Sequence, residues 1–378
     1  MKWLKKNFFS TWYYSLLTIL TVLFVYYLLC AFFNWAFFIA QWRVIQANLR
    51  LFLIGIYPEE AIWRIWSGLI ILFILLGVTW KKLFNQAIIT PLFIFLFPLV
   101  LAWIPISWSN RIFLLAACVS FVAGAYVFSY LLRKRNTVFF CWLVYLPLFI
   151  LLVRGFNLFE NFTYVSSTYW SGLLLTFLIA ILGILFSFPL GVLLALGRRC
   201  SLPVIRYFCV LYIEIIRGMP LITVLFMMQV MLPLFLPEGI NIDRVLRAIL
   251  AFICFSAAYL AENVRGGLQS VPKGQEEAAW ALGMSPIKTM VFVILPQALR
   301  NIIPILVGQF ISLFKDTSLV AVVGLLDFLG IAQSILANPN FLGRQKEVYV
   351  FIAIIYWFFS WSLSVASQRL EKRLNVKA

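Results

Sequence analysis

Long apolar stretches recur along almost the whole chain and limit its fold more than any other feature. An α-helix needs about 20 apolar residues to cross a bilayer, and about ten stretches approach or exceed this length. They lie near residues 12–33, 62–80, 89–106, 112–132, 138–153, 169–196, 202–236, 245–260, 302–314 and 348–366. The sequence therefore predicts an all-α polytopic membrane protein with about ten transmembrane helices.

Composition and charge agree with this prediction. With 64% hydrophobic and 11% charged residues and a mean hydropathy of +1.02, a soluble globule would expose far too much apolar surface. The net charge of +17 is concentrated in short basic clusters between the apolar stretches, which the positive-inside rule explains without nucleic acid as a partner. These clusters are Lys2-Lys5-Lys6, Lys81-Lys82, Arg133-Lys134-Arg135, Arg198-Arg199 and Lys372-Arg373. They predict that both termini are cytoplasmic.

The residues needed for most hydrolytic and zinc chemistry are missing from the sequence. There is no histidine, which removes His-dependent acid–base catalysis and catalytic triads. The six cysteines lack metal-ligand spacing and lie mostly in apolar stretches, so we interpret them as buried thiols. We expect no catalytic residue, no metal site and no enzyme activity.

Residues 1–168 form a predicted membrane extension of about five spans. Its first apolar stretch is longer than a signal peptide and does not end in small residues, so we expect a retained anchor. Near residues 41–56, Trp42, Ile45 and Leu49 recur at helical spacing opposite polar residues, which predicts a helix lying in the interface plane. These spans carry almost no charge, and their tryptophans lie near predicted interfaces, as in an aromatic belt.

Residues 169–378 differ because polar groups enter the apolar stretches. Glu214 and Arg217 are three residues apart, so on a helix they share a face and can pair, while Gly218 and Pro220 kink or break the helix. Two interpretations remain open: a salt-bridged hinge at the cytoplasmic membrane edge, or a direct role in a substrate path.

Two further polar groups follow. Glu262 and Arg265 repeat the three-residue spacing, and the run Lys315-Asp316-Thr317-Ser318 ends the stretch 302–314. Such a run at membrane depth is costly unless it faces protein or water, so it either lines a pathway or forms a buried ion pair. Residues 324–340, which contain Asp327, are expected to form a short outside or re-entrant element.

A polar interval near residues 271–301 is predicted to lie outside the lipid. Glu276, Glu277, Ala278 and Ala279 favour a helix, and Gly283 followed by Pro286 ends it after about three turns. Small alanine side chains allow another surface to approach closely. The residue types suggest a docking element.

The spacing of this interval resembles a known motif. Glu277-Ala278-Ala279, then Gly283, Val293 and Leu295-Pro296 resemble the EAA loop of ABC-importer permeases, with Val293 where that family usually has Ile. Matching segments in the same order extend the resemblance from about residue 170 to the C-terminus, to permeases of the polar amino acid uptake family. They are Glu214-x-x-Arg217-Gly218-x-Pro220, Ala261-Glu262-x-x-Arg265-Gly266-Gly267, Leu295-Pro296-Gln297-Ala298-Leu299-Arg300 and Lys315-Asp316-Thr317-Ser318-Leu319. The N-terminal extension resembles the longer permease subunits of general L-amino-acid transporters of Gram-negative bacteria.

The resemblance implies a type I ABC-importer permease core of five spans in a bacterial inner membrane. It also implies a periplasmic amino-acid-binding protein, a second permease subunit of different sequence, and two ATPase subunits that hold ATP-Mg. This chain has no Gly-x-x-x-x-Gly-Lys-Ser/Thr loop and is expected to bind no cofactor. The implied ATPase-docking residues are Glu276, Glu277, Ala278, Ala279, Gly283 and Pro296. The implied substrate-pathway residues are Glu214, Arg217, Gly218, Pro220, Glu262, Arg265, Lys315, Asp316, Thr317 and Ser318.

Two other functions fit parts of the sequence. The chain could be a structural permease subunit whose partner permease carries the substrate site. It could also be an ion-coupled secondary amino-acid carrier, with Asp316 or Glu262 as the ion site. The predicted docking element near residues 271–301 argues against the carrier, because a secondary carrier has no use for such an element.

Overall fold

The computed structural model describes residues 7–84, 108–131, 135–156 and 163–374. These residues form helices and turns, and their one β-bridge is an isolated contact between Gly172 and Asp327. The predicted all-α class is confirmed. The predicted span 89–106 lies outside the described residues.

The helices of the first part of the chain are α2, α3, α4, α6, α7 and α8. Their bounds are Trp12–Asn34, Arg43–Ile54, Ile62–Phe84, Trp108–Ala123, Ser129–Leu131 and Arg135–Arg154. The π-helical turns Trp35–Ile39 and Gly124–Phe128 extend α2 and join α6 to α7.

The second part begins with the long helix α9, Gly172–Arg198. It continues through α10 to α14 with bounds Pro203–Gly218, Leu221–Phe226, Leu232–Phe235, Arg244–Ser270 and Lys273–Ala281. The last helices are α15 to α19, with bounds Pro286–Thr289, Leu295–Asn301, Ile303–Asp316, Phe328–Leu336 and Gln345–Leu374.

Seven helices in the described residues are long and apolar enough to cross a membrane, and one bent pair would make an eighth. That pair is Pro203–Gly218 with Leu221–Phe235, bent by 108°. The break predicted at Gly218 and Pro220 is therefore present, because Pro220 has no N–H to continue the helical ladder. In the predicted span 112–132, the apolar helical part covers only residues 115–128. The expected count of about ten spans is not confirmed.

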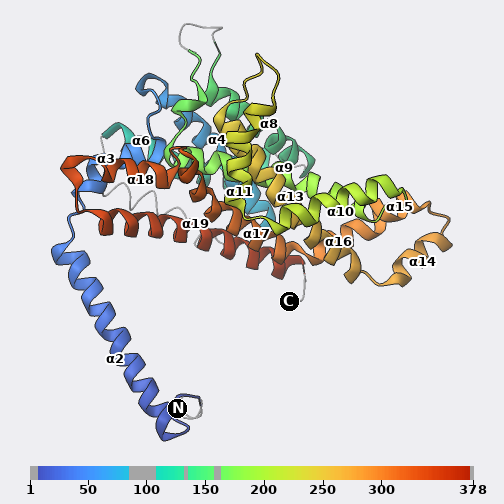
Figure 1. Ribbon diagram of the computed structural model, residues 1–378, viewed down its shortest axis with the longest axis horizontal. Helices are drawn as coiled ribbons and strands as arrows, with labels where there is room; N and C mark the ends of the chain where they lie inside the picture. Colours follow the sequence, from blue (N-terminus) through green and yellow to red (C-terminus); the bar gives the residue numbers. More distant parts are fainter. Residues whose placement is uncertain (1–6, 85–107, 132–134, 157–162, 375–378) are drawn as a thin grey trace.

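The helices α9 and α13 pack along each other at the centre of the body (Figure 1). One apolar cluster joins Ile179 of α9 and Phe252 of α13 to Leu225 of α11, all fully buried. A second cluster joins Leu260 and Val264 of α13 to α16. The central position of α13 means that groups along it contact several other helices.

The predicted amphipathic helix near residues 41–56 is α3. Its apolar side is buried, but the residues covering Val44, Ile45, Leu49 and Phe52 come from α9, α18 and α19 of the same chain. The apolar face is thus covered by protein, while the predicted position of this helix in the interface plane stays a prediction. Helical periodicity identifies an apolar face but does not distinguish protein from lipid as its cover.

The extension is joined to the second part of the chain where α3 ends and α9 begins. Ile56 N–H donates to Ser171 Oγ at 2.9 Å, and Gly172 N–H donates to the Leu326 carbonyl at 2.8 Å. Gly172 has φ +66°, and a Cβ there would lie 2.7 Å from the Phe52 carbonyl oxygen. Only glycine fits both the backbone conformation and the close approach.

The apolar helix α2 extends away from the other helices (Figure 1). None of its residues is buried, and the same holds for the apolar stretch that it forms with the following π-helical turn, Trp12–Ile39. Its surface is left for lipid or for another protein.

Replacing Gly172 with alanine tests this junction. We expect a loss of about 1–2 kcal/mol from the left-handed backbone and roughly 1–3 kcal/mol more from overpacking. Gly239→Ala is the matched control, because Gly239 has φ +91° but nothing within 4 Å of a Cβ. Thermal unfolding of the purified protein in detergent measures both, and equal losses would contradict the close packing described here.

Candidate functional site

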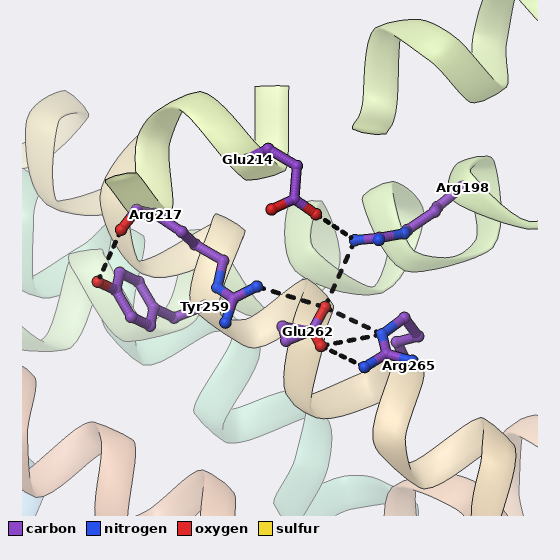
Figure 2. A network of polar contacts seen from close by, with 6 residues as sticks. All are labelled: Arg198, Glu214, Arg217, Tyr259, Glu262 and Arg265. Carbon is purple, nitrogen blue, oxygen red and sulfur yellow. Dashed lines mark hydrogen bonds and ion pairs between the residues drawn. The ribbon is translucent and has the colours of Figure 1, made fainter. Parts of the chain in front are cut away.

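An ion network joins α9, α10 and α13 (Figure 2). At its centre, Glu262 of α13 accepts hydrogen bonds from Arg265 Nε at 2.9 and 3.0 Å. Arg198 Nη1 of α9 lies 3.4 Å and Arg217 Nη1 of α10 lies 3.6 Å from the Glu262 carboxylate. Arg198 also pairs with Glu214 of α10 at 3.1 Å. One carboxylate thus holds three guanidinium groups from three helices.

The predicted pairing of Glu214 with Arg217 is wrong. Among the ion pairs of the described residues, Glu214 contacts Arg198 and Arg217 contacts Glu262. The two side chains share a face as expected, but neighbouring helices supply opposite charges closer to each of them. The same spacing does produce a pair between Glu262 and Arg265.

Arg217 is also held to α13 through Tyr259. The Tyr259 hydroxyl donates to the Arg217 carbonyl at 3.4 Å, and the guanidinium carbon lies 5.8 Å from the centre of the Tyr259 ring. These contacts attach the last turn of α10 to α13 immediately before Gly218 and Pro220, where the chain bends. The network therefore lies directly beside the bend.

The run from Lys315 to Ser318 forms a separate polar region. Lys315 and Asp316 end α17, whereas Thr317 is fully buried and donates from Oγ to the Phe314 carbonyl at 2.7 Å. Ser318 Oγ donates to the Lys315 carbonyl at 2.9 Å. In the part of the chain that the structure describes, no ion pair or hydrogen bond joins this run to the Glu262 network. The residues expected to line one path thus lie in two groups.

Sequence reasoning missed a third polar group between α13 and α17. Asn263 Nδ2 donates to Gln309 Oε1 at 2.6 Å, and Gln309 Nε2 donates to the Ser256 carbonyl at 3.0 Å and to its hydroxyl at 3.2 Å. Ser256 and Asn263 are seven residues apart, which places them on one helix face. The available signal was the presence of carboxamides inside two otherwise apolar spans.

The docking interval forms the short helices α14 and α15 at one end of the molecule, away from its centre (Figure 1). Glu277 and Ala278 are exposed, whereas Ala279 is buried against the rest of the chain. Gly283 ends the turn after α14 with φ +76°, and Pro296 is exposed in the first turn of α16.

Large apolar side chains surround these residues and were not singled out in the sequence. They are Trp280, Leu282, Ile287 and Phe292, which are 51%, 83%, 78% and 70% exposed. A concentration of exposed apolar groups on a polar, charged segment indicates a protein-binding surface.

Asp327 is buried and caps a helix. Its fully buried carboxylate caps α18, accepting from Gly330 N–H at 2.9 Å and Leu329 N–H at 3.3 Å. Burial raises the pKa of Asp327 to about 7, although the two backbone N–H groups favour its charged form. The segment expected to be a short outside or re-entrant element is thus partly a helix packed against α3 and α9.

Comparison with known proteins identifies the family. Residues 187–376 match the family described as binding-protein-dependent transport system inner membrane component. The chain is 40% identical over 392 aligned positions to the inner membrane amino-acid ABC transporter permease protein YhdY of Escherichia coli K12, covering 99% of this chain and 93% of that protein. The chain belongs to this family.

This permease also has other relatives. It is 36% identical to the glutamate/glutamine/aspartate/asparagine transport system permease protein BztC of Rhodobacter capsulatus, over 89% of this chain and 79% of that protein. A solved structure of an amino acid ABC transporter with histidines matches 53% of this chain and 92% of its own, with 35% identity and a TM-score of 0.49.

Family membership establishes the general role of the chain. It is an inner-membrane permease subunit of an amino-acid ABC importer and not an enzyme, because ATP hydrolysis occurs in a separate subunit in this family. The family also implies an ATPase and a substrate-binding protein as partners.

Replacing Glu262 with glutamine tests the ion network. The Glu262 side chain is only 22% exposed and three arginines share it. We expect a loss of about 1–2 kcal/mol, towards the lower end of the range for a charged hydrogen bond, because solvent screens part of the interaction. Glu59→Gln is the matched control, because the Glu59 side chain is 77% exposed in its pair with Arg50. This substitution should lower the stability by less than about 1 kcal/mol. Equal shifts in thermal unfolding temperature would show that the network contributes no more than a surface pair.

Asp327 makes stability depend on pH. Its pKa of about 7 in the folded protein lies above the ordinary value of roughly 3.9, so the folded state retains a proton that the unfolded state releases. Stability from this group is therefore present below pH of about 4 and is lost as pH rises towards about 7. Asp327→Asn keeps the cap and should flatten this slope when thermal unfolding is followed from about pH 5 to 8. An unchanged slope would contradict the assignment of this pH dependence to Asp327.

Proposed function

We propose that this chain forms one half of the path of an ATP-driven importer of L-amino acids and is driven by a separate ATPase that docks on α14 and α15. The main observation is the exposed docking surface, in which Glu277 and Ala278 lie beside exposed Trp280, Leu282 and Ile287. A side chain such as Leu282, left 83% exposed, is stabilised when a partner covers it.

Force from the ATPase has a short route to the transport path. Only Val271 and Pro272 separate α14 from α13, which is the central helix of the body. Through Glu262 and Tyr259, α13 holds Arg217 beside the bend between α10 and α11. A movement of α14 would thus reach the bend as a rigid-body shift, the usual form of a switching transition.

The orientation follows from the docking surface. The ATPase works in the cytoplasm, so α14 lies on that side. Arg198 and Arg199, at the end of α9, are basic residues of the kind that the positive-inside rule keeps cytoplasmic. We place both termini in the cytoplasm on the same grounds.

The substrates are proposed to be polar L-amino acids over a broad range. The name of the Rhodobacter relative includes glutamate, glutamine, aspartate and asparagine. In the ion network, three arginines against two glutamates leave one net positive charge, which favours the approach of a carboxylate. A periplasmic binding protein would deliver the amino acid, and a second, different permease would form the other half of the path.

Replacing Gly283 with tryptophan tests the docking surface. The change should reduce amino-acid-stimulated ATP hydrolysis by about tenfold or more in liposomes containing the complete transporter, because the indole would block the partner's approach. Gly343→Trp is the matched control: φ is +76° at Gly283 and +79° at Gly343, and at neither would a Cβ meet an atom within 4 Å. Both variants carry the same backbone strain, so the difference reports contact with the ATPase.

The outcomes separate the candidate functions. Equal hydrolysis in both variants would contradict docking at α14. Failure of the wild-type chain to copurify with an ATPase, together with gradient-driven uptake by the chain alone, would favour the ion-coupled carrier.

A further inference from the structure

The hydrogen-bond chain from Ser256 through Gln309 to Asn263 determines how each carboxamide is oriented. A carbonyl oxygen only accepts, so the group of Gln309 that lies 3.0 Å from the Ser256 carbonyl must be its NH₂ group. Gln309 therefore presents its oxygen to Asn263, and Asn263 must present a donor, at 2.6 Å. The backbone of α13 thus determines the orientation of a side chain one residue beyond Glu262.

This orientation leaves part of the Asn263 carboxamide unused. One N–H of Nδ2 is taken by Gln309, while the second N–H and Oδ1 have no partner recorded within the described part of the chain. Asn263 is half-buried, whereas Ser256 is 1% exposed. The buried end of the hydrogen-bond chain is fixed, and its more accessible end carries one free donor and one free acceptor.

The surroundings of Asn263 are open on this side. Gly266 lies one turn further along α13, and Gly308 precedes Gln309 on α17. A Cβ at either glycine would meet nothing within 4 Å. Ser312, one turn beyond Gln309, is exposed. An unpaired amide facing lipid would be costly, so this polar surface on two membrane-spanning helices faces water or another protein.

The neighbouring charged residues are less suited to hold a substrate. Arg217 and Arg265 are each already paired with Glu262. A ligand would have to displace one of these ion pairs, whereas Asn263 offers its groups without breaking a bond. A neutral amide also carries no charge of its own to favour acidic over basic side chains.

We propose that the Asn263 carboxamide is a binding site for the shared backbone groups of amino acids. Its Oδ1 accepts from the ammonium group, and its second N–H donates to the carboxylate. Gln309 acts as a positioning residue that holds the amide in this orientation. This proposal rests on the proposed function and adds a particular contact to it.

The test measures binding without the periplasmic protein, which would otherwise impose its own selectivity. The complex of this chain with its partner permease and ATPase is placed in nanodiscs, and equilibrium binding of radiolabelled glutamine, glutamate and lysine is measured. Asn263→Leu removes both proposed contacts and should weaken glutamine binding by more than about tenfold, whereas Gln309→Leu releases the orientation of the amide and should weaken binding by about tenfold or less. Gln333→Leu is the matched control, because Gln333 is exposed on α18, outside the polar group.

A charge change separates binding from a purely structural role. Asn263→Asp keeps the acceptor for ammonium, but it replaces the NH₂ group, and with it the hydrogen bond to Gln309, with a negatively charged oxygen. Affinity should therefore shift from glutamate towards lysine, with their ratio changing by about tenfold. A structural amide would not change this ratio. If Asn263→Leu fails to copurify with the ATPase, the ratio of glutamate to lysine affinity in Asn263→Asp decides whether Asn263 binds the amino acid.

Three results would overturn the proposal: no amino acid binding by the wild-type complex, unchanged glutamine affinity in Asn263→Leu, or an unchanged ratio in Asn263→Asp. Each is compatible with uptake by the complete transporter, so the proposed function would stand. Absence of any L-amino-acid uptake by the complete wild-type transporter would instead reject the proposed function.

Discussion

The packing of α13 against α9 is the interaction on which the rest of this permease depends. These helices share fully buried side chains such as Ile179 and Phe252, and their contact fixes the position of α13 along most of its length. Within the membrane a helix satisfies its own backbone, so only side chains remain to meet other elements. Because α13 lies at the centre, its polar side chains have partners from α9, α10 and α17.

The charges near the end of α13 show how a membrane protein can hold ionised groups. Glu262 contacts three arginines, so no one of these charges has to be stabilised by lipid. The same contacts tie the last turn of α10 to α13 immediately before a 108° bend. Only two residues separate α13 from α14, so the network, the bend and the proposed docking surface lie on connected elements of the chain.

The N-terminal extension is a structural part of the same body in α3 and α4, and separate from it in α2. Phe52 of α3 packs on α18 and α19, and Tyr57 enters the core around α9. Gly172 allows the backbones to approach closely at this junction. By contrast, α2 buries none of its residues against the described part of the chain. The extension therefore contributes both to the stability of the core and to a surface beyond it.

The sequence by itself determined features that depend on nearby residues: the all-α membrane class, the break at Gly218 and Pro220, and the turn at Gly283 that follows α14. These follow from apolar length and from the backbone preferences of proline and glycine, which act locally. Only the tertiary structure decided which charges pair and which faces are covered. It turned Glu214 towards Arg198, placed α3 against protein, and joined Asn263 to Gln309 across 46 residues of sequence. Such contacts depend on how distant helices pack, and residue spacing within one helix carries no information about that packing.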